Sequence, residues 1–228
     1  MRRVLDVARI QLTNWPRMVV YPLALMASLA VLGLVIDLSN GGAADQVFLL
    51  QTIYLVVAGA HLQTITQVFP FAVGLSVTRR DFFAATALVV TGYAVVFGVV
   101  QLGFLGIERA SGGWGRQVRI FDLDYLRQGN LLAQWLAYTI PFLAVSAAAV
   151  LLGVVFQRWQ QPGVYVLATG VVALLAGIGV LVSALGRWPE IGRFFARQPP
   201  LALNAGYPLA IALILGAVAW LAIRRATP

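Results

Sequence analysis

Long apolar runs separated by short polar segments set the pattern of this chain. A helix needs roughly 20 mostly apolar residues to cross the hydrocarbon core of a bilayer. Six runs come near or exceed that length, at about 19–36, 47–69, 84–105, 131–156, 164–185 and 205–223. The pattern therefore predicts an all-α integral membrane protein, in which residues 1–228 form a single transmembrane domain of six transmembrane helices.

The first apolar run has an alternative interpretation as a cleaved signal peptide. Small residues that would suit cleavage follow it at 41–44. The run is longer than the 7–15 apolar residues typical of a signal sequence, and the leader before it is long. We therefore interpret 19–36 as a retained first span and 37–45 as the turn that follows it.

The later runs carry two further signals. Pro141 predicts a kink in the fourth run, and 157–162 predicts a short connection to the fifth run. Small residues four positions apart, at 149/153, 173/177, 179/183 and 212/216, are candidate seams for close packing of helices.

The first 17 residues are more polar and predict an amphipathic helix. Apolar and polar positions both recur at helical spacing, namely Leu5, Ala8, Leu12 and Trp15 beside Arg2, Asp6, Arg9 and Thr13. Such a helix would lie in the plane of the lipid headgroups. A plain cytoplasmic tail is the alternative interpretation of this segment.

Composition and charge support a membrane location and give it an orientation. Hydrophobic residues make up 61% of the chain, and all sixteen basic residues are arginines that end the apolar runs or lie between them. That placement is typical of membrane topology and not of nucleic-acid binding. One set of segments (1–17, 70–83, 157–162 and 224–228) holds nine arginines and two acids, whereas the other holds seven arginines and six acids. The positive-inside rule predicts both termini in the cytoplasm, for a multi-pass protein of the cytoplasmic membrane.

Several kinds of chemistry are missing from the sequence. A P-loop needs a lysine to reach the phosphates, and the chain has none. No acid lies in the middle of an apolar run, as the relay of a proton-coupled carrier or the site of an intramembrane protease would require. One histidine without cysteines cannot supply an ordinary zinc site. We expect no catalytic residues and no cofactor bound by this chain.

The second run, 47–69, is unusually polar for a span. Its candidates for lining a solute path are Gln51, Tyr54, His61, Thr64 and Gln67. Polar groups in lipid are costly unless they face protein or water, so this helix either lines a path or bonds to neighbouring helices. For His61 we favour a neutral side chain with a hydrogen bond over a proton-transfer site, because no carboxylate is near it in sequence.

The segment 69–83, FPFAVGLSVTRRDFF, has the most distinctive local sequence. An apolar turn, a glycine, a Ser or Thr and then Arg-Arg-Asp lead into the third run. This pattern resembles the short cytoplasmic segment of ABC-2-type transporter permeases, six-span subunits that include those found beside antibiotic-resistance ATPases in actinomycetes. The resemblance implies that 70–83 is a coupling segment. Its implied contact residues are Gly74, Ser76, Thr78, Arg79, Arg80, Asp81 and Phe82.

The same resemblance implies the rest of the assembly. The chain would be the permease of an ABC exporter and not an enzyme, while a separate ABC ATPase subunit binds ATP and Mg2+. A second permease, identical or related, would complete a path for a hydrophobic or amphipathic, lipid-like solute. Residues 1–17 look like the family's elbow helix and 186–208 like its re-entrant outer elements, whereas 106–129 is longer than the family's minimal loop. The alternatives are a membrane scaffold or assembly protein without a transported substrate, and a secondary transporter or channel.

Two finer expectations concern the coupling segment. Phe71, Leu75 and Phe82 recur at helical spacing, which predicts one apolar face against the membrane or neighbouring spans. The 79–81 side would then face the cytoplasm, where Asp81 either caps the third helix or pairs with a partner arginine. The alternative is that Arg79 and Arg80 serve only as topology anchors.

Overall fold

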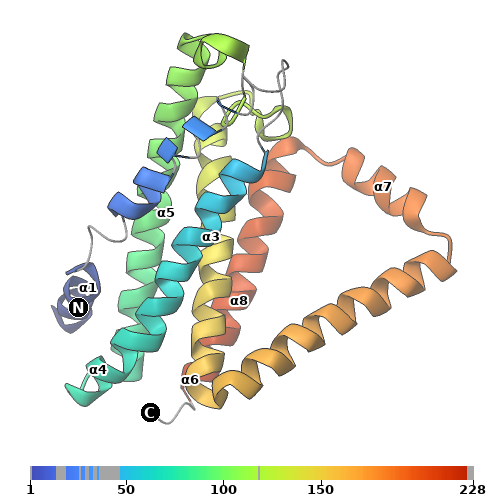
Figure 1. The fold of residues 1–228 in the computed structure, drawn as a ribbon. Helices are drawn as coiled ribbons and strands as arrows, with labels where there is room; N and C mark the ends of the chain where they lie inside the picture. The colour runs from blue at the N-terminus through green and yellow to red at the C-terminus, as the bar shows by residue number, and fades with distance from the viewer. Residues whose placement is uncertain are drawn as a thin grey trace.

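The described part of the chain is built from helices (Figure 1). The computed structural model describes residues 2–13, 19–25, 27–28, 31–32, 35, 47–117 and 119–224. Its helices are α1 (Arg2–Leu12), α3 (Val47–Gln63), α4 (Phe69–Gly74), α5 (Arg79–Ala110), α6 (Leu131–Ala184), α7 (Trp188–Ala196) and α8 (Tyr207–Ile223). Shorter turns are η1 (Thr64–Val68), η2 (Gly113–Gln117), η3 (Asp124–Leu126) and η4 (Ala202–Gly206). The all-α prediction is confirmed for these residues.

Four helices in the described residues are long and apolar enough to cross a membrane. They are Thr52–Gly74, Arg79–Ala110, Leu131–Ala184 and Ala202–Ile223. Of the predicted first span, the described positions between 19 and 35 are helical, and the predicted turn 37–45 lies outside the described residues. The third predicted span, 84–105, is the middle of the longer α5, which begins at the Thr78 cap and continues to Ala110.

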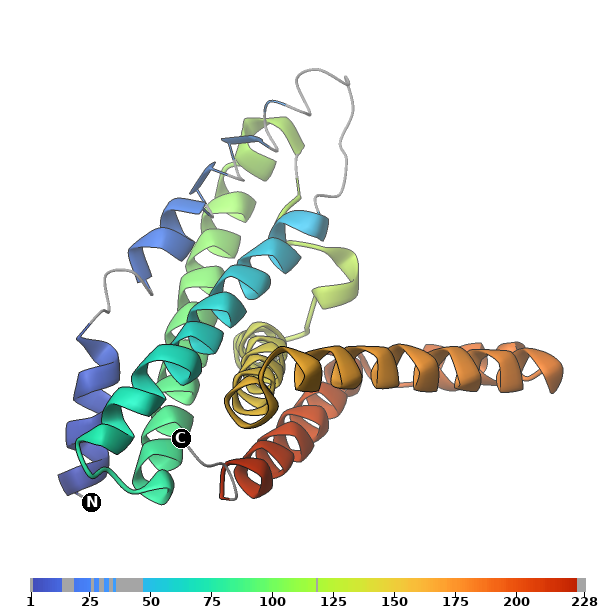
Figure 2. The same cartoon turned by 60° about the horizontal axis from the view of Figure 1, so that its bottom comes forward.

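A bundle forms the body of the molecule (Figures 1 and 2). The first part of α6 lies at its centre and packs against α3, α5 and α8. On the outside of the bundle, α1 packs on α5 through Val7, Ala8 and Gln11, which are buried. From the predicted amphipathic stripe, Leu5 and Leu12 remain exposed, so the stripe and the packing face coincide only at Ala8.

A sharp kink divides α6 at Gln160. This residue has φ 55 and ψ −153, a backbone region that is essentially restricted to glycine. The sequence predicted a connection at 157–162, and the kink at Gln160 lies within it. The kink predicted at Pro141 is wrong, because the dihedral angles of Pro141 are helical.

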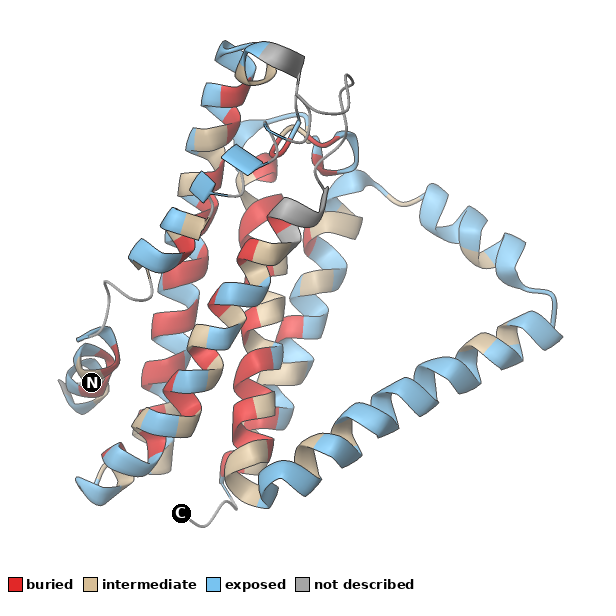
Figure 3. Cartoon of the chain, in the orientation of Figure 1, coloured by how far each residue is buried: buried red, intermediate tan, exposed pale blue. Residues whose placement is uncertain are grey.

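Beyond the kink, residues 161–184 leave the bundle. Figures 1 and 2 show this part of α6 pointing away from the other helices, with α7 leading back to η4 and α8. Its side chains are almost all exposed in Figure 3, although they are apolar. The small-residue pairs predicted at 173/177 and 179/183 therefore make no close helix contact within the described chain.

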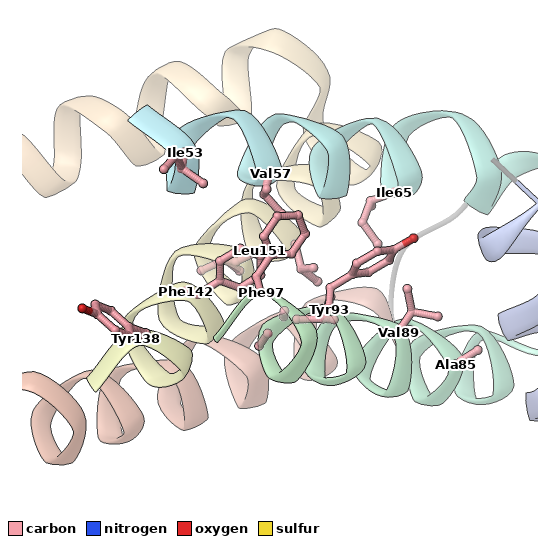
Figure 4. Packing of buried hydrophobic residues seen from close by; sticks show 14 of the residues in the cluster. Ile53, Val57, Ile65, Ala85, Val89, Tyr93, Phe97, Tyr138, Phe142 and Leu151 are labelled. Carbon is pink, nitrogen blue, oxygen red and sulfur yellow. The ribbon is translucent and has the colours of Figure 1, made fainter. Parts of the chain in front are cut away.

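The core lies where α3, α5 and α6 meet (Figure 4). Phe142 on α6 stacks on Phe97 of α5 at 5.2 Å between ring centroids and meets the edge of Tyr54 of α3 at 5.8 Å. Gly153 on α6 allows a close approach, because a Cβ at this position would lie 2.7 Å from the Cβ of Ile65. The predicted pair Ala149/Gly153 is thus a real packing seam.

Candidate functional site

A capped turn carries the predicted coupling residues. The chain leaves α4 through Ser76, which has the left-handed φ of 61, and enters α5 at Thr78. The Thr78 hydroxyl accepts a hydrogen bond from the Asp81 backbone N–H at 3.1 Å and donates one to the Asp81 carboxylate at 2.8 Å. Of its two predicted roles, Asp81 therefore has the capping role in this structure.

The two arginines of this turn have different surroundings. The Arg79 guanidinium donates a hydrogen bond to the Arg224 carbonyl at 3.2 Å, and so satisfies a carbonyl at the end of α8. The Arg80 side chain is exposed. Arg79 and Asp81 therefore both form solvent-exposed hydrogen bonds within the chain. The expectation that the 79–81 side faces the cytoplasm stays a prediction.

The prediction that Phe71, Leu75 and Phe82 share one apolar face is wrong. Phe82 is fully buried and its ring packs against Phe69 at 5.1 Å, whereas Phe71 and Leu75 are 59% and 57% exposed. The helix phase is broken by the turn after Gly74, so spacing across 71–82 does not describe one face. The exposed tip consists of Pro70, Phe71, Leu75, Ser76 and Arg80, and we call it the α4 tip.

A contact from α6 holds the base of α4 in place. Pro70 has no N–H to donate to the carbonyl of Thr66, four residues earlier. The Gln157 amide donates to that carbonyl at 2.8 Å and to the Ile65 carbonyl at 3.3 Å. Gln157 lies three residues before the kink at Gln160, so the π-helical turn η1 and the α6 kink are joined through one side chain.

The residues of the second run that were predicted to line a solute path lie on two different sides of α3 and η1. Tyr54 points into the core, with its hydroxyl 3.2 Å from the Tyr138 carbonyl and 3.3 Å from Oε1 of Gln101. His61 is buried beside Tyr93, at 5.9 Å between ring centroids. Tyr54 and His61 thus both contact α5, and Tyr54 also contacts α6, while the side chain of Gln51 lies outside the described part.

Thr64 and Gln67 belong to a different place, a cleft between α1, residues 21–22 and α3–η1. The cleft has a volume of about 580 Å³. Gln11, Gln63, Thr64 and Gln67 give it a polar lining, alongside apolar residues such as Val56. The arrangement offers amide groups and apolar surface together, which suits an amphipathic molecule.

Several buried polar atoms have no hydrogen-bond partner among the described residues. They include Nε2 of His61, the Tyr93 hydroxyl and Nε2 of Gln101. The predicted hydrogen bond of His61 to a neighbouring helix is therefore not formed at Nε2. All three lie along the α3–α5 contact, where unsatisfied groups lower the stability of this packing.

Glu108 organises the segment that follows α5, a role that the sequence did not reveal. Its buried carboxylate accepts backbone N–H groups from Ile120, Phe121 and Asp122 at 2.8–3.1 Å, and the Trp114 indole N–H at 3.1 Å. The position of Glu108 in the last turn of an apolar helix could have indicated this role. A buried carboxylate there needs hydrogen-bond donors, which the following segment of the chain can supply. The described residues of 106–129 therefore form a cap that is held together by the Glu108 carboxylate.

An ionic network covers this cap. Asp122 pairs with Arg109 at 2.7 Å and with Arg127 at 3.0 Å, and Arg119 pairs with Asp124 at 3.1 Å. The hydrogen bond from Arg109, together with that from Arg127, holds the pKa of Asp122 below its usual value. The cap is thus stabilised by charges that lie outside the lipid-facing helices.

The described residues contain no group of three or more His, Cys, Asp or Glu that would hold a metal ion. The residues described above offer hydrogen bonds, apolar surface and single charges. Comparisons with models of protein families, with curated proteins and with solved structures found no match to this chain. Function must accordingly be argued from the arrangement itself.

Proposed function

We propose that this chain is the permease subunit of an ABC exporter, with six spans and both termini in the cytoplasm. The four long apolar helices support a multi-pass protein. A straight helix of 54 residues would measure about 80 Å, far more than the roughly 30 Å of a hydrocarbon core. The Gln160 kink divides α6 into two segments of spanning length, and the helical positions between 19 and 35 supply the sixth span.

The α4 tip is the observation that carries the proposal. Phe71 and Leu75 expose their apolar side chains next to the exposed cation of Arg80, between two spans. Exposed aromatic and arginine side chains on a small ordered projection are typical of protein contacts. A separate ABC ATPase, which binds ATP and Mg2+, is the partner we propose for this tip.

The tip is connected to the bundle in a way that would transmit a push. Movement of α4 would be passed to α6 by the Gln157 bonds to Ile65 and Thr66. It would be passed to α8 by the Arg79 bond to Arg224. These contacts lead to the cytoplasmic end of the first part of α6. This end lies beside the strained kink at Gln160, where the helix changes direction.

The cleft lined by Gln11, Thr64 and Gln67 is our proposed entry for a lipid-like or amphipathic solute. It lies against η1, so a change in η1 would alter its shape. Interruptions of α-helix by a π-turn are frequent at functional sites. In this account a second permease, identical or related, forms the other half of the path.

Copurification with the ATPase tests the proposal. The protein is extracted from its native membrane, and associated ATPases are identified by mass spectrometry. A Phe71→Ala/Leu75→Ala variant should remain in the membrane and lose the ATPase, because the apolar contact is removed. Leu88→Ala, an exposed leucine on α5 away from the tip, is the matched control and should retain it. Equal recovery with the tip variant, or no ATPase with the wild type, would contradict the proposal. An ATPase that binds without any solute being moved would favour the scaffold alternative.

A further inference from the structure

Helix α7 has two faces of opposite character and no buried residue. Trp188, Ile191 and Phe195 recur at positions i, i+3 and i+7, so they share one face. Glu190, Arg193 and Arg197 have the same spacing on the opposite face. The Trp188 and Phe195 side chains are 54% and 47% exposed, so the rest of the described chain does not cover the apolar face.

The described arginine side chains of the cap and of α7 differ in the acids that are available to pair with them. In the outer cap, Arg109, Arg119 and Arg127 all pair with Asp122 or Asp124. In and beside α7, the only acid is Glu190, which pairs with Arg187 at 3.5 Å.

Arg193 and Arg197 form no ion pair with a described residue, although they lie one turn apart on the same face. Like charges at this spacing repel each other unless an anion lies between them. Both arginines line a shallow hollow of about 320 Å³, together with Glu190, Phe194 and Gln198. The hollow is wide enough for a phosphate-sized group, and one wall is aromatic.

We propose that α7 lies in the headgroup plane of the bilayer and binds anionic phospholipids through Arg193 and Arg197. The Trp188–Ile191–Phe195 face enters the boundary with the acyl chains, as in other interfacial helices. The two guanidinium groups then hold the phosphate of an acidic headgroup, for which their forked donors are suited. Figure 1 shows α7 leading from the far end of 161–184 back to η4 and α8, at the end of the bundle that carries the cap. There Asn204 of η4 donates a hydrogen bond to the Tyr125 carbonyl at 2.7 Å. The inference goes beyond transport. The proposed orientation would place α7 in the outer leaflet, and nothing else in the inference rests on the proposed function.

Native mass spectrometry of the detergent-solubilised protein tests the lipid site. Phosphatidylglycerol and phosphatidylcholine with identical acyl chains are added in turn, and the bound lipid is counted. Each arginine near an anionic lipid surface contributes about fivefold in affinity, so Arg193→Gln/Arg197→Gln should weaken phosphatidylglycerol binding by about 25-fold. Phosphatidylcholine binding should be unchanged, and Arg193→Lys/Arg197→Lys should retain most of the preference. Arg119→Gln removes a paired arginine at the same end of the molecule. It is the control for the loss of a positive charge that is not part of the proposed lipid site.

The position of the helix is tested separately in vesicles of mixed phosphatidylglycerol and phosphatidylcholine. The chain has no native cysteine, so single-cysteine variants can be labelled without background. Ile191→Cys should be protected from a water-soluble maleimide, and Glu190→Cys should react. The inference is overturned if the double glutamine variant keeps its lipid preference, if Ile191→Cys reacts as fast as Glu190→Cys, or if excess inorganic phosphate displaces the lipid. None of these outcomes depends on an ATPase, so the result stands apart from the test of the proposed function.

Discussion

At the scale of single residues, Arg79 and Arg80 are neighbours with different tasks. Arg79 satisfies a carbonyl at the end of α8, whereas Arg80 is exposed at the α4 tip. The local sequence, Arg-Arg-Asp, gives no means to tell them apart, because the distinction depends on where residue 224 lies in space.

Separate substitutions of these arginines should therefore have different effects. Arg80→Ala should lower ATPase binding by roughly fivefold to thirtyfold, as truncation of a partner-facing arginine commonly does, and leave the melting temperature unchanged. Arg79→Ala should lower the melting temperature by removing a bond that joins α5 to α8. Binding assays and thermal unfolding of each purified variant measure the two effects. If both variants lose only membrane insertion, the arginines are topology anchors and the coupling role is wrong.

Asp122 offers a pH test of the outer cap. Its pKa is lowered in the folded state by Arg109 first and also by Arg127, so its contribution to stability is complete above the ordinary carboxyl pKa. That contribution is lost as the pH falls below about 4, through the lowered pKa. Thermal unfolding at a series of pH values should show this loss in the wild type.

The variant Asp122→Asn should be less stable at neutral pH by about 1–3 kcal/mol, because charge-assisted bonds are removed. Its stability should then fall less steeply on acidification. Asp6→Asn is the control, since the Asp6 carboxylate is exposed and lies 4.0 Å from Arg9. An Asp122→Asn protein with the full acid sensitivity of the wild type would show that other groups control the cap.

At the scale of elements, hydropathy predicted the long helices and the place of the break in α6, but not the form of the joints. α3, α5 and α8 follow from runs of apolar residues, because burial in lipid or protein acts on every residue of the run. The break at Gln160 lies within the predicted connection 157–162, whereas the expected kink at Pro141 is absent because its backbone stays helical. Hydropathy does not show that the dihedral angles of one residue carry the change of direction at Gln160.

The candidate site was likewise predicted only in part. The polar second run was recognised, but its side chains serve a core contact at Tyr54 and a cleft at Gln67, which only the neighbouring helices distinguish. The cap was missed because Glu108 acts on backbone groups 12–14 residues away, through a turn with no regular period.

The link between η1 and α6 can be tested by a double-mutant cycle. Gln157→Leu should destabilise the protein by about 1–3 kcal/mol, because the Thr66 carbonyl loses its partner in a partly buried position. In a Pro70→Ala background, the restored N–H at position 70 can bond to Thr66. Gln157→Leu should then cost clearly less, so that the two substitutions are not additive.

Chemical unfolding of the four proteins in detergent measures this coupling. Gln161→Leu, a change of the same type four residues along at an exposed position with helical dihedral angles, is a control for loss of an amide. Additive effects of Gln157→Leu and Pro70→Ala would mean that Gln157 does not compensate for the proline.

At the scale of the whole molecule, orientation in the membrane is the first property to establish. The α4 tip and the outer cap lie at opposite ends of α5, a helix of 32 residues and about 48 Å. We predict that Ser76 is inside and that Ser111 and Gln198 are outside. In intact cells an impermeant maleimide should label Ser111→Cys and Gln198→Cys, and label Ser76→Cys only after the membrane is opened. Labelling of Ser76→Cys from outside would invert the assignment.

The central claim is that a separate ATPase drives this chain through the α4 tip. The most direct measurement is the ATP hydrolysis rate of the copurified ATPase, reconstituted in vesicles with the wild-type chain or with Phe71→Ala/Leu75→Ala. The account predicts that the wild-type chain changes the hydrolysis rate of the ATPase several-fold, and that the tip variant, inserted to the same extent, leaves it at the rate of the ATPase alone. Equal hydrolysis rates with the wild-type chain and the tip variant would contradict the account.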